Sequence, residues 1–280
     1  MKTTKFVSIV STLLLISFSF IFFNGCNKDD DKSGGNLIIK ITDDPFPANL
    51  VEEANVTISK IEIREKSANE GDPYIILVET PISYNLLDLR NGFTADLPEF
   101  DVPVGVYDHI RLYISEASAK LKDETTYDLT VPSGAQTGIK IFIKPYIQVQ
   151  GGLTAELILD FDVNKSFVAL GNINSSGGIE GFHFKPVIRA VNSSTAGRIG
   201  GTVSDTSSNY LSDASVWIEQ DTIISFTITD STGFYALIGI PAGTYSIYAT
   251  KMDFDTVTYP NIEVIEGNQT LQDFILTPLE

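Results

Sequence analysis

Apolar residues occupy every second position in many segments of the chain after residue 35, and no other feature restricts the fold as strongly. Leu37, Ile39 and Ile41 show this spacing near the start, and Tyr245 and Ile247 show it near the end. A period of two places such residues on one face of a β-strand, whereas a helix needs a period near 3.6. No amphipathic segment is long enough to supply the helices of a parallel α/β fold. The sequence therefore predicts an all-β protein.

The expected strands are short and are separated by turn-forming residues, in keeping with 21 Gly and 12 Pro in 280 residues. This spacing is typical of an antiparallel sandwich or a partly open barrel. The apolar pattern shifts by one between Ile58 and Ile61, which predicts a β-bulge at Ser59 and Lys60. Asn91 followed by Gly92 predicts a turn. Further strands of the first half are expected at 74–78, 107–114, 127–131, 138–143, 153–163, 166–170 and 182–191.

The amino terminus has charged, then apolar, then small residues before the only cysteine. Lys2 and Lys5 precede an uncharged run of 18 residues, 6–23, and Gly25 stands immediately before Cys26. This order resembles a bacterial lipoprotein signal peptide, in which residues 1–25 are removed and the Cys26 thiol receives a lipid. The resemblance implies attachment to a membrane through a lipid anchor. An uncleaved anchor helix is the alternative, because a run of this length can just span a bilayer.

Residues 26–35 follow as a tether rich in Asp, Lys, Ser and Gly. Such a composition cannot pack into a core, and it gives a folded domain reach from its anchor. The acidic run 29–31 resembles the surface-export signal of Bacteroidota lipoproteins. The resemblance implies a lipid-anchored protein of the outer membrane, exposed at the cell surface.

Several short motifs lie between residues 36 and 191: TDDP at 42–45, LLDL at 86–89, VPVGVY at 102–107, VPSG at 131–134, GIK at 138–140, LDFD at 159–162 with Ser166, and FKPV at 184–187. Together they resemble a family of uncharacterised domains found in bacterial lipoproteins. That family has no assigned activity. The resemblance implies a β-rich extracytoplasmic module without a mechanism.

A polar connection at 192–197 leads to a second module at 198–280, with the motifs GGTVSD at 200–205, TDSTGFY at 229–235 and IPAGTY at 240–245. These motifs resemble a carboxypeptidase regulatory-like domain, which has a transthyretin-like sandwich. About seven strands fit the remaining length. The resemblance implies a spacer or adhesive unit that does not itself catalyse a reaction. The predicted architecture is two β-sandwich-like domains in tandem after a signal peptide.

The formal net charge of −17 opposes nucleic-acid binding, because phosphate backbones carry the same sign. No run of basic residues indicates a patch that would attract anionic lipid. A single cysteine permits neither an internal disulfide nor a thiolate metal cluster. We therefore expect no nucleic-acid partner and no cofactor.

The sequence contains only two histidines, so it offers few imidazole groups that could act as a base or a zinc ligand in hydrolysis. His109 precedes Ile110 in an expected strand, and His183 lies between Phe182 and Phe184, so both are expected on a solvent face. A catalytic zinc ion normally needs three protein ligands, and a nucleophile needs a neighbouring base. Residues 133–140 contain glycines and a lysine but lack the spacing of a phosphate loop, and they are expected to form a turn. We assign no catalytic residue and no metal ligand.

A group of acidic residues is the one feature of the sequence that could indicate a metal site or an enzyme. Asp160 and Asp162 share one strand face at a separation of ~7 Å, with Glu156 further along. We expect a solvated acidic surface. The alternatives are a calcium site, if Asp43 and Asp44 approach from the neighbouring loop, and a carboxylate-based or metal-assisted hydrolase that acts on envelope or extracellular polymers.

The expected function is that of a non-catalytic binding or structural module at the cell surface, with a glycan or another envelope protein as its partner. Loops at strand ends are the expected contact surface. Trp217, Tyr84 and Tyr107 are the aromatic residues that would stack on sugar rings, although core packing is the commoner use of such side chains.

Overall fold

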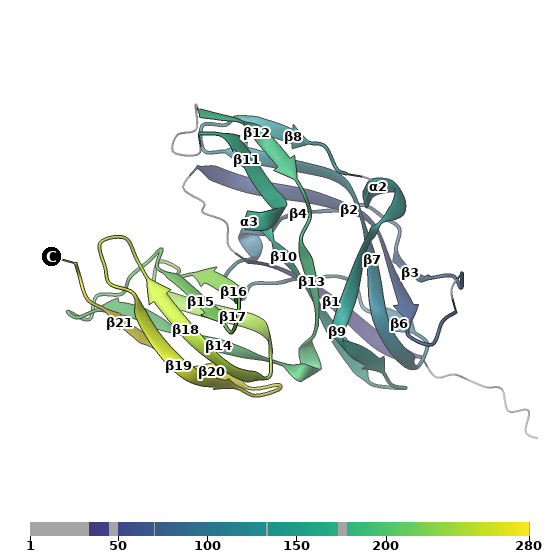
Figure 1. Cartoon of the computed structure of the whole chain (residues 1–280). Helices are drawn as coiled ribbons and strands as arrows, with labels where there is room; N and C mark the ends of the chain where they lie inside the picture. The colour runs from purple at the N-terminus through teal and green to yellow at the C-terminus, as the bar shows by residue number, and fades with distance from the viewer. Residues whose placement is uncertain (1–33, 45–49, 70, 133, 173–177, 280) are drawn as a thin grey trace, which may run out of the picture. The chain divides into compact units, whose positions relative to one another are not determined.

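The computed structural model describes residues 34–44, 50–69, 71–132, 134–172 and 178–279, and strands make up most of it (Figure 1). None of the described helices is longer than four residues. The prediction of an all-β protein is confirmed. In the part of the chain described, no helix has the length and apolar character needed to cross a membrane. The expected signal peptide, Cys26 and most of the tether lie outside the described residues.

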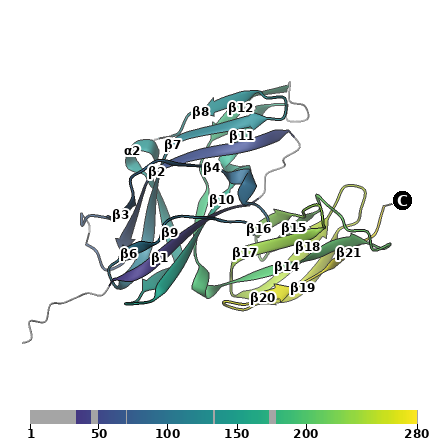
Figure 2. The ribbon, with the colours of Figure 1, turned by 180° about the vertical axis from the view of Figure 1, so that it is seen from behind.

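The first half of the described chain forms an 11-stranded sheet. Its main path runs in the order β3 (Ile75–Val78), β2 (Val51–Glu65), β7 (Gly105–Leu121), β9 (Ile139–Val149), β13 (Ile188–Asn192), β10 (Thr154–Asp162), β1 (Gly35–Asp44) and β5 (Ala95–Asp96). Three more strands pair with β2, β1 and β7 respectively: β4 (Ile82–Asn85), β6 (Phe100–Val102) and β8 (Thr126–Leu129). A hairpin of β11 (Phe167–Gly171) and β12 (Ile179–Phe184) lies with β12 beside β8 (Figures 1 and 2).

The core of this half is formed by alternate side chains of its strands. In β7, Ile110, Leu112 and Ile114 are fully buried, whereas Arg111 and Tyr113 between them are half-buried on the opposite face. The same alternation continues in the paired strands β2 and β9. Because the side-chain period of a strand is two, each buried row leaves a second row outside the core.

Most strand pairs are antiparallel, as expected, but β1 pairs with β10 in parallel, and β13 pairs with β9 in parallel. A two-residue turn can join only antiparallel neighbours, whereas a long connection leaves the direction open. More than 100 residues separate β1 from β10 along the chain. The prediction of an antiparallel arrangement is therefore corrected at these pairs.

Local turn chemistry accounts for several details. The register between β2 and β7 shifts on both sides of Ile58, which confirms the predicted bulge. Asn91 and Gly92 have φ values of +58° and +80°, which confirms the predicted turn. The strand expected at 182–191 is divided into β12 and β13 around Pro186, which lacks a backbone donor. The LLDL motif forms a 3-10 helix, η1 (Leu86–Leu89).

Residues 196–279 form two four-stranded sheets rather than the expected seven strands. The residues expected as a connection form the end of β13, the 3-10 helix η3 (Ser193–Thr195) and the start of β14. One sheet contains β14 (Ala196–Asp205), β17 (Phe234–Pro241), β20 (Gln269–Leu271) and β21 (Phe274–Leu276), the last two parallel to β14. The other contains β15 (Ser215–Glu219), β16 (Ile223–Ile228), β18 (Gly243–Thr250) and β19 (Val257–Val264).

A P-x-G-x-Y motif occurs in both halves of the chain, at 103–107 and at 241–245. The Tyr107 hydroxyl donates to the Pro103 carbonyl at 2.7 Å, and the Tyr245 hydroxyl donates to the Pro241 carbonyl at 2.8 Å. Both rings are buried. Each bond fastens the start of a strand, β7 or β18, to the residues that lead into it, in the manner of the tyrosine corner of β-sandwiches.

We expect Tyr107→Phe and Tyr245→Phe each to lower the free energy of unfolding by about 1 kcal/mol, because each variant leaves a proline carbonyl without its donor. Chemical denaturation of the purified chain measures the loss. Tyr259→Phe is the matched control, since its ring is 37% exposed and a change within about 0.5 kcal/mol is normal for such sites. If all three variants behaved alike, the two hydroxyl bonds would have no stabilising role.

Candidate functional site

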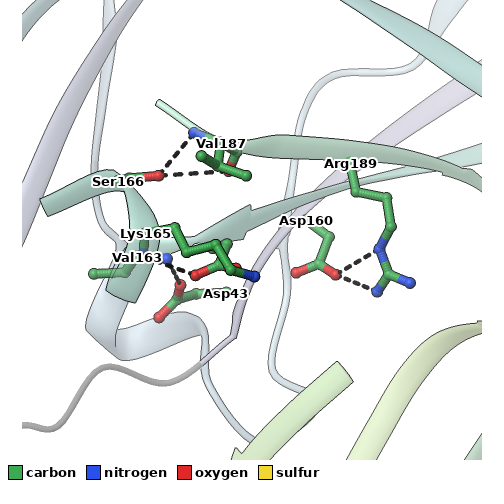
Figure 3. A network of polar contacts seen from close by, with 8 residues as sticks. Asp43, Asp160, Val163, Lys165, Ser166, Val187 and Arg189 are labelled. Atoms are coloured by element: carbon green, nitrogen blue, oxygen red, sulfur yellow. Dashed lines mark hydrogen bonds and ion pairs between the residues drawn. The ribbon is translucent and has the colours of Figure 1, made fainter. Parts of the chain in front are cut away.

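The carboxylates of the LDFD motif and those of the TDDP motif lie at the ends of two neighbouring strands. In the parallel ladder of β1 and β10, Thr42 is paired with Asp160 and Asp44 with Asp162. This pairing brings together, from positions more than 100 residues apart, the acidic residues that the sequence indicated as the alternative chemical site. Figure 3 shows the contacts around Asp43, Asp160 and Arg189.

Asp160 is buried beneath an ion pair with Arg189 of the adjacent strand β13. The Arg189 Nε donates to Asp160 Oδ2 at 3.2 Å, and Nη2 of the same guanidinium contacts the same oxygen. Burial raises the pKa of Asp160, and the Arg189 charge acts in the opposite direction. The expectation of a solvated face is wrong for Asp160, which is 6% exposed. Ile158 on the same face is also buried, beside Val191 and Ala196.

Asp162 and Asp43 satisfy backbone donors at the start of the short helix α3 (Val163–Ser166). Asp162 is the N-cap residue and accepts from the Lys165 backbone N–H at 2.9 Å, and its other oxygen lies 2.6 Å from Lys165 Nζ. Asp43 Oδ1 accepts from the Val163 N–H at 3.2 Å. Carboxylates at a helix start are stabilised by the unpaired N–H groups there. Both residues therefore have a structural use.

The neighbouring polar residues are also committed to contacts inside the protein. Ser166 is fully buried, and its hydroxyl accepts from the Val187 N–H at 2.9 Å. Glu156 lies 2.8 Å from Lys40 Nζ and accepts from the Ser193 hydroxyl at 2.7 Å. Partial burial opposes ionisation of Glu156, but these two contacts prevail and lower its pKa. Among the described residues, no group of three or more His, Cys, Asp or Glu side chains could hold a metal ion.

The two histidines lie apart from these carboxylates. His183 is exposed on β12, as expected. His109 is less exposed than expected, because it contacts Asp108 and its ring packs 4.5 Å from that of Phe142. In the segment 133–140, which was expected to form a turn between strands, residues 134–137 form the four-residue helix α2 (Gly134–Thr137) and β9 begins at Ile139. Ser133 and Cys26 lie outside the described residues.

The three aromatic residues considered for sugar stacking have different environments. Tyr107 is fully buried, and burial with a contribution from Glu65 raises its pKa to about 12, so this residue has the commoner use, core packing, and does not face a sugar ring. Tyr84 is half-buried against the core. Trp217 is half-buried and stacks on Tyr248 of the neighbouring strand, with centroids 5.1 Å apart and planes 5° apart. Cross-strand aromatic pairs of this kind stabilise sheets.

Arg189, which forms the ion pair with Asp160, is not among the residues that the sequence indicated. The two residues are 29 positions apart and become neighbours only through the pairing of β10 with β13. An arginine in a mainly apolar strand, opposite an aspartate in another such strand, is the signal that could have indicated the pair.

We expect Arg189→Met to lower the free energy of unfolding by about 3 kcal/mol at neutral pH, because it leaves Asp160 buried without its counter-charge. The loss should shrink as the pH falls toward the ordinary range of a carboxyl group, since protonation in the folded state removes the buried charge. Asp160→Leu combined with Arg189→Met should restore most of the stability. Arg198→Met, at an exposed position, is the control in denaturation measurements. An equal loss for Arg189→Met and Arg198→Met would contradict this account of Asp160.

Solved structures similar to this chain have low identity and low TM-scores. They include a type II cohesin–X-dockerin complex from Acetivibrio cellulolyticus (17% identity, 29% of this chain and 58% of that one, TM-score 0.25). The Bacillus anthracis TIE protein is 15% identical, and the match covers 88% of this chain and 34% of that one with a TM-score of 0.25. The minor pilin GBS52 of Streptococcus agalactiae is 8% identical, and the match covers 87% of this chain and 96% of that one with a TM-score of 0.25. Likenesses at this level carry no conclusion about function. The match spans less than two thirds of the length of the cohesin–dockerin chain and of the TIE protein.

Two family models match the chain. The carboxypeptidase regulatory-like domain matches residues 198–277, and the domain of unknown function DUF4382 matches residues 34–186. No curated protein matches at a significant level. Because the DUF4382 match spans more than half of the 280 residues, this protein belongs to the DUF4382 family, and it carries a carboxypeptidase regulatory-like domain after the family's defining region.

Proposed function

We propose that this chain is a bacterial outer-membrane lipoprotein, anchored through Cys26, whose β domains act as a non-catalytic binding or structural module at the cell surface. One observation carries the non-catalytic part: the carboxylates best suited to chemistry are engaged by protein donors. Asp160 contacts Arg189, Asp162 contacts Lys165, and Asp43 accepts from the Val163 backbone. A general acid or base must instead face a substrate.

The order of residues at the amino terminus supports the anchor. Two lysines, an uncharged run and a small residue precede Cys26, and a charged tether follows it. The carboxypeptidase regulatory-like domain supports a spacer or adhesive role for residues 198–277. The partner we propose is a glycan or another envelope protein. No observation favours a hydrolase, because Asp160 and Asp162 are occupied as described above.

Radiolabelled palmitate supplied to growing bacteria should appear on the wild-type chain and be absent from Cys26→Ala, since the chain has no other cysteine. The control combines Cys26→Ala with Ser33→Cys, which restores a thiol away from the signal-peptide junction and should also stay unlabelled. Label on either variant, or its absence from the wild type, would refute the lipid anchor.

Protease added to intact cells should degrade the wild-type chain if the lipoprotein faces outward. Replacing the acidic run by Asp29→Asn, Asp30→Asn and Asp31→Asn should keep the palmitate label but protect the chain, because the proposed export signal is lost. Lys28→Gln with Lys32→Gln is the matched control and should remain degraded. Protection of the wild type would show that it faces the periplasm.

A further inference from the structure

The outer face of β3, β2, β7 and β9 gathers most of the exposed rings and many of the cations of the first half of the chain. Its opposite side forms the core through residues such as Ile61, Ile110 and Ile141. These strands are neighbours in the sheet (Figure 1). We call this surface the basic-aromatic face and define it by Lys60, Glu62, Arg64, Lys66, Tyr74, His109, Arg111, Tyr113, Lys140, Phe142, Lys144 and Tyr146.

Strand register places these side chains in rows. Glu62 on β2 is paired with Arg111 on β7, which is paired in turn with Lys140 on β9. In the next row Arg64 is paired with His109, and His109 with Phe142. Directly paired residues have Cβ atoms about 5 Å apart. The face is therefore a regular array on a stiff sheet.

The array is positively charged in a protein whose net charge is −17. Six of the 19 Lys and Arg residues lie on it, and the sequence showed no basic run because they come from three strands and a loop end. Its enclosed carboxylate is Glu62, which is 7% exposed and receives the Tyr113 hydroxyl at 2.9 Å. Asp108 contacts His109, and Glu65 and Glu79 lie at the border. The structure therefore gathers cations that the sequence keeps apart.

Rings lie beside most of these cations. The Arg111 guanidinium is 4.0 Å from the centroid of Tyr74, and Lys66 Nζ is 4.3 Å from that of Tyr146. Lys140 and Lys144 both lie within 6 Å of the Phe142 ring. Phe142 is 54% exposed and Tyr146 is 49% exposed. Cation–π contacts of this kind favour arrangements in which the cations lie beside the rings on the surface.

The cations at the β9 side of the face have no carboxylate partner among the described residues: Lys66, Lys140 and Lys144 make no ion pair there. Elsewhere Lys40, Lys120 and Lys165 each contact a carboxylate, whereas the exposed Lys122 and Lys185 form no ion pair among the described residues and have no ring contact either. An unpaired cation beside an exposed ring can bind an external anion without first giving up an internal partner.

We propose that the basic-aromatic face binds an acidic glycan, a polysaccharide whose sugars bear carboxylate or sulfate groups. The lysines pair with the acidic groups, and Phe142 and Tyr146 pack against the apolar faces of sugar rings. Duplex nucleic acid and an anionic bilayer would also meet these cations. Both extend far beyond the face, however, and would encounter the negative charge of the remaining surface. A single glycan chain is narrow enough to stay on the array.

This inference deepens the proposed binding role but does not depend on the lipid anchor, which palmitate labelling tests separately. The full-length chain, purified in a neutral detergent, is presented to heparin, polygalacturonate, dextran, duplex DNA and vesicles with anionic lipid. We expect binding to heparin or polygalacturonate that weakens with added salt, and none to uncharged dextran. No binding to either acidic polysaccharide at low ionic strength, or tighter binding to DNA or vesicles, would overturn the proposal.

Matched variants test the location. Lys66→Gln, Lys140→Gln and Lys144→Gln together should weaken binding about tenfold, as expected for three surface charges of about 0.5 kcal/mol each. Lys122→Gln, Lys185→Gln and Arg198→Gln remove the same charge at exposed positions elsewhere and should change the affinity less than about twofold. Phe142→Ala should weaken binding a few-fold with the charge unchanged. Equal losses in the two triple variants, or no effect of Phe142→Ala, would refute this site.

Discussion

Burial of alternate residues of β2, β7 and β9 in one core is the constraint on which the rest of this structure depends. A slip by a single residue would exchange the two faces of a strand and expose its share of Ile61, Ile110 and Ile141, so burial of these residues restricts the register. The same register then sets Glu62, Arg111 and Lys140 side by side on the opposite face. The polar surface is thus a consequence of how the apolar residues pack.

The charged residues divide into two groups according to their surroundings. Around the ends of β1 and β10, carboxylates are held by donors of the protein itself, as in the pair Asp160–Arg189. Leaving a buried charge without such a partner costs several kcal/mol, so these residues are fastened in place and have a structural role. On the basic-aromatic face, several cations contact aromatic rings and form no ion pair with any carboxylate that the structure describes. The first arrangement suits a scaffold, and the second suits recognition.

The two halves of the chain share the P-x-G-x-Y motif and the hydrogen bond that its tyrosine makes. In each, a glycine begins a core strand, a proline lies two residues before it and a tyrosine two residues after it, and the tyrosine hydroxyl donates to the proline carbonyl. The two strands, β7 and β18, are central strands of their sheets. The two hydroxyl bonds therefore hold the chain at the start of a central strand in each half.

The amino-acid sequence by itself determined the strand-rich fold, the bulge near Ile58 and the turn at Asn91, because periodicity and turn chemistry are local properties. It also indicated the exposed position of His183. Only the tertiary structure decided that β1 lies parallel to β10, that Asp160 is buried against Arg189, and that Lys66, Lys140 and Phe142 share one face. These relations join residues from distant parts of the chain, and local patterns do not encode which strands become neighbours. Pairing of strands over long sequence separations is set by the packing of the whole core.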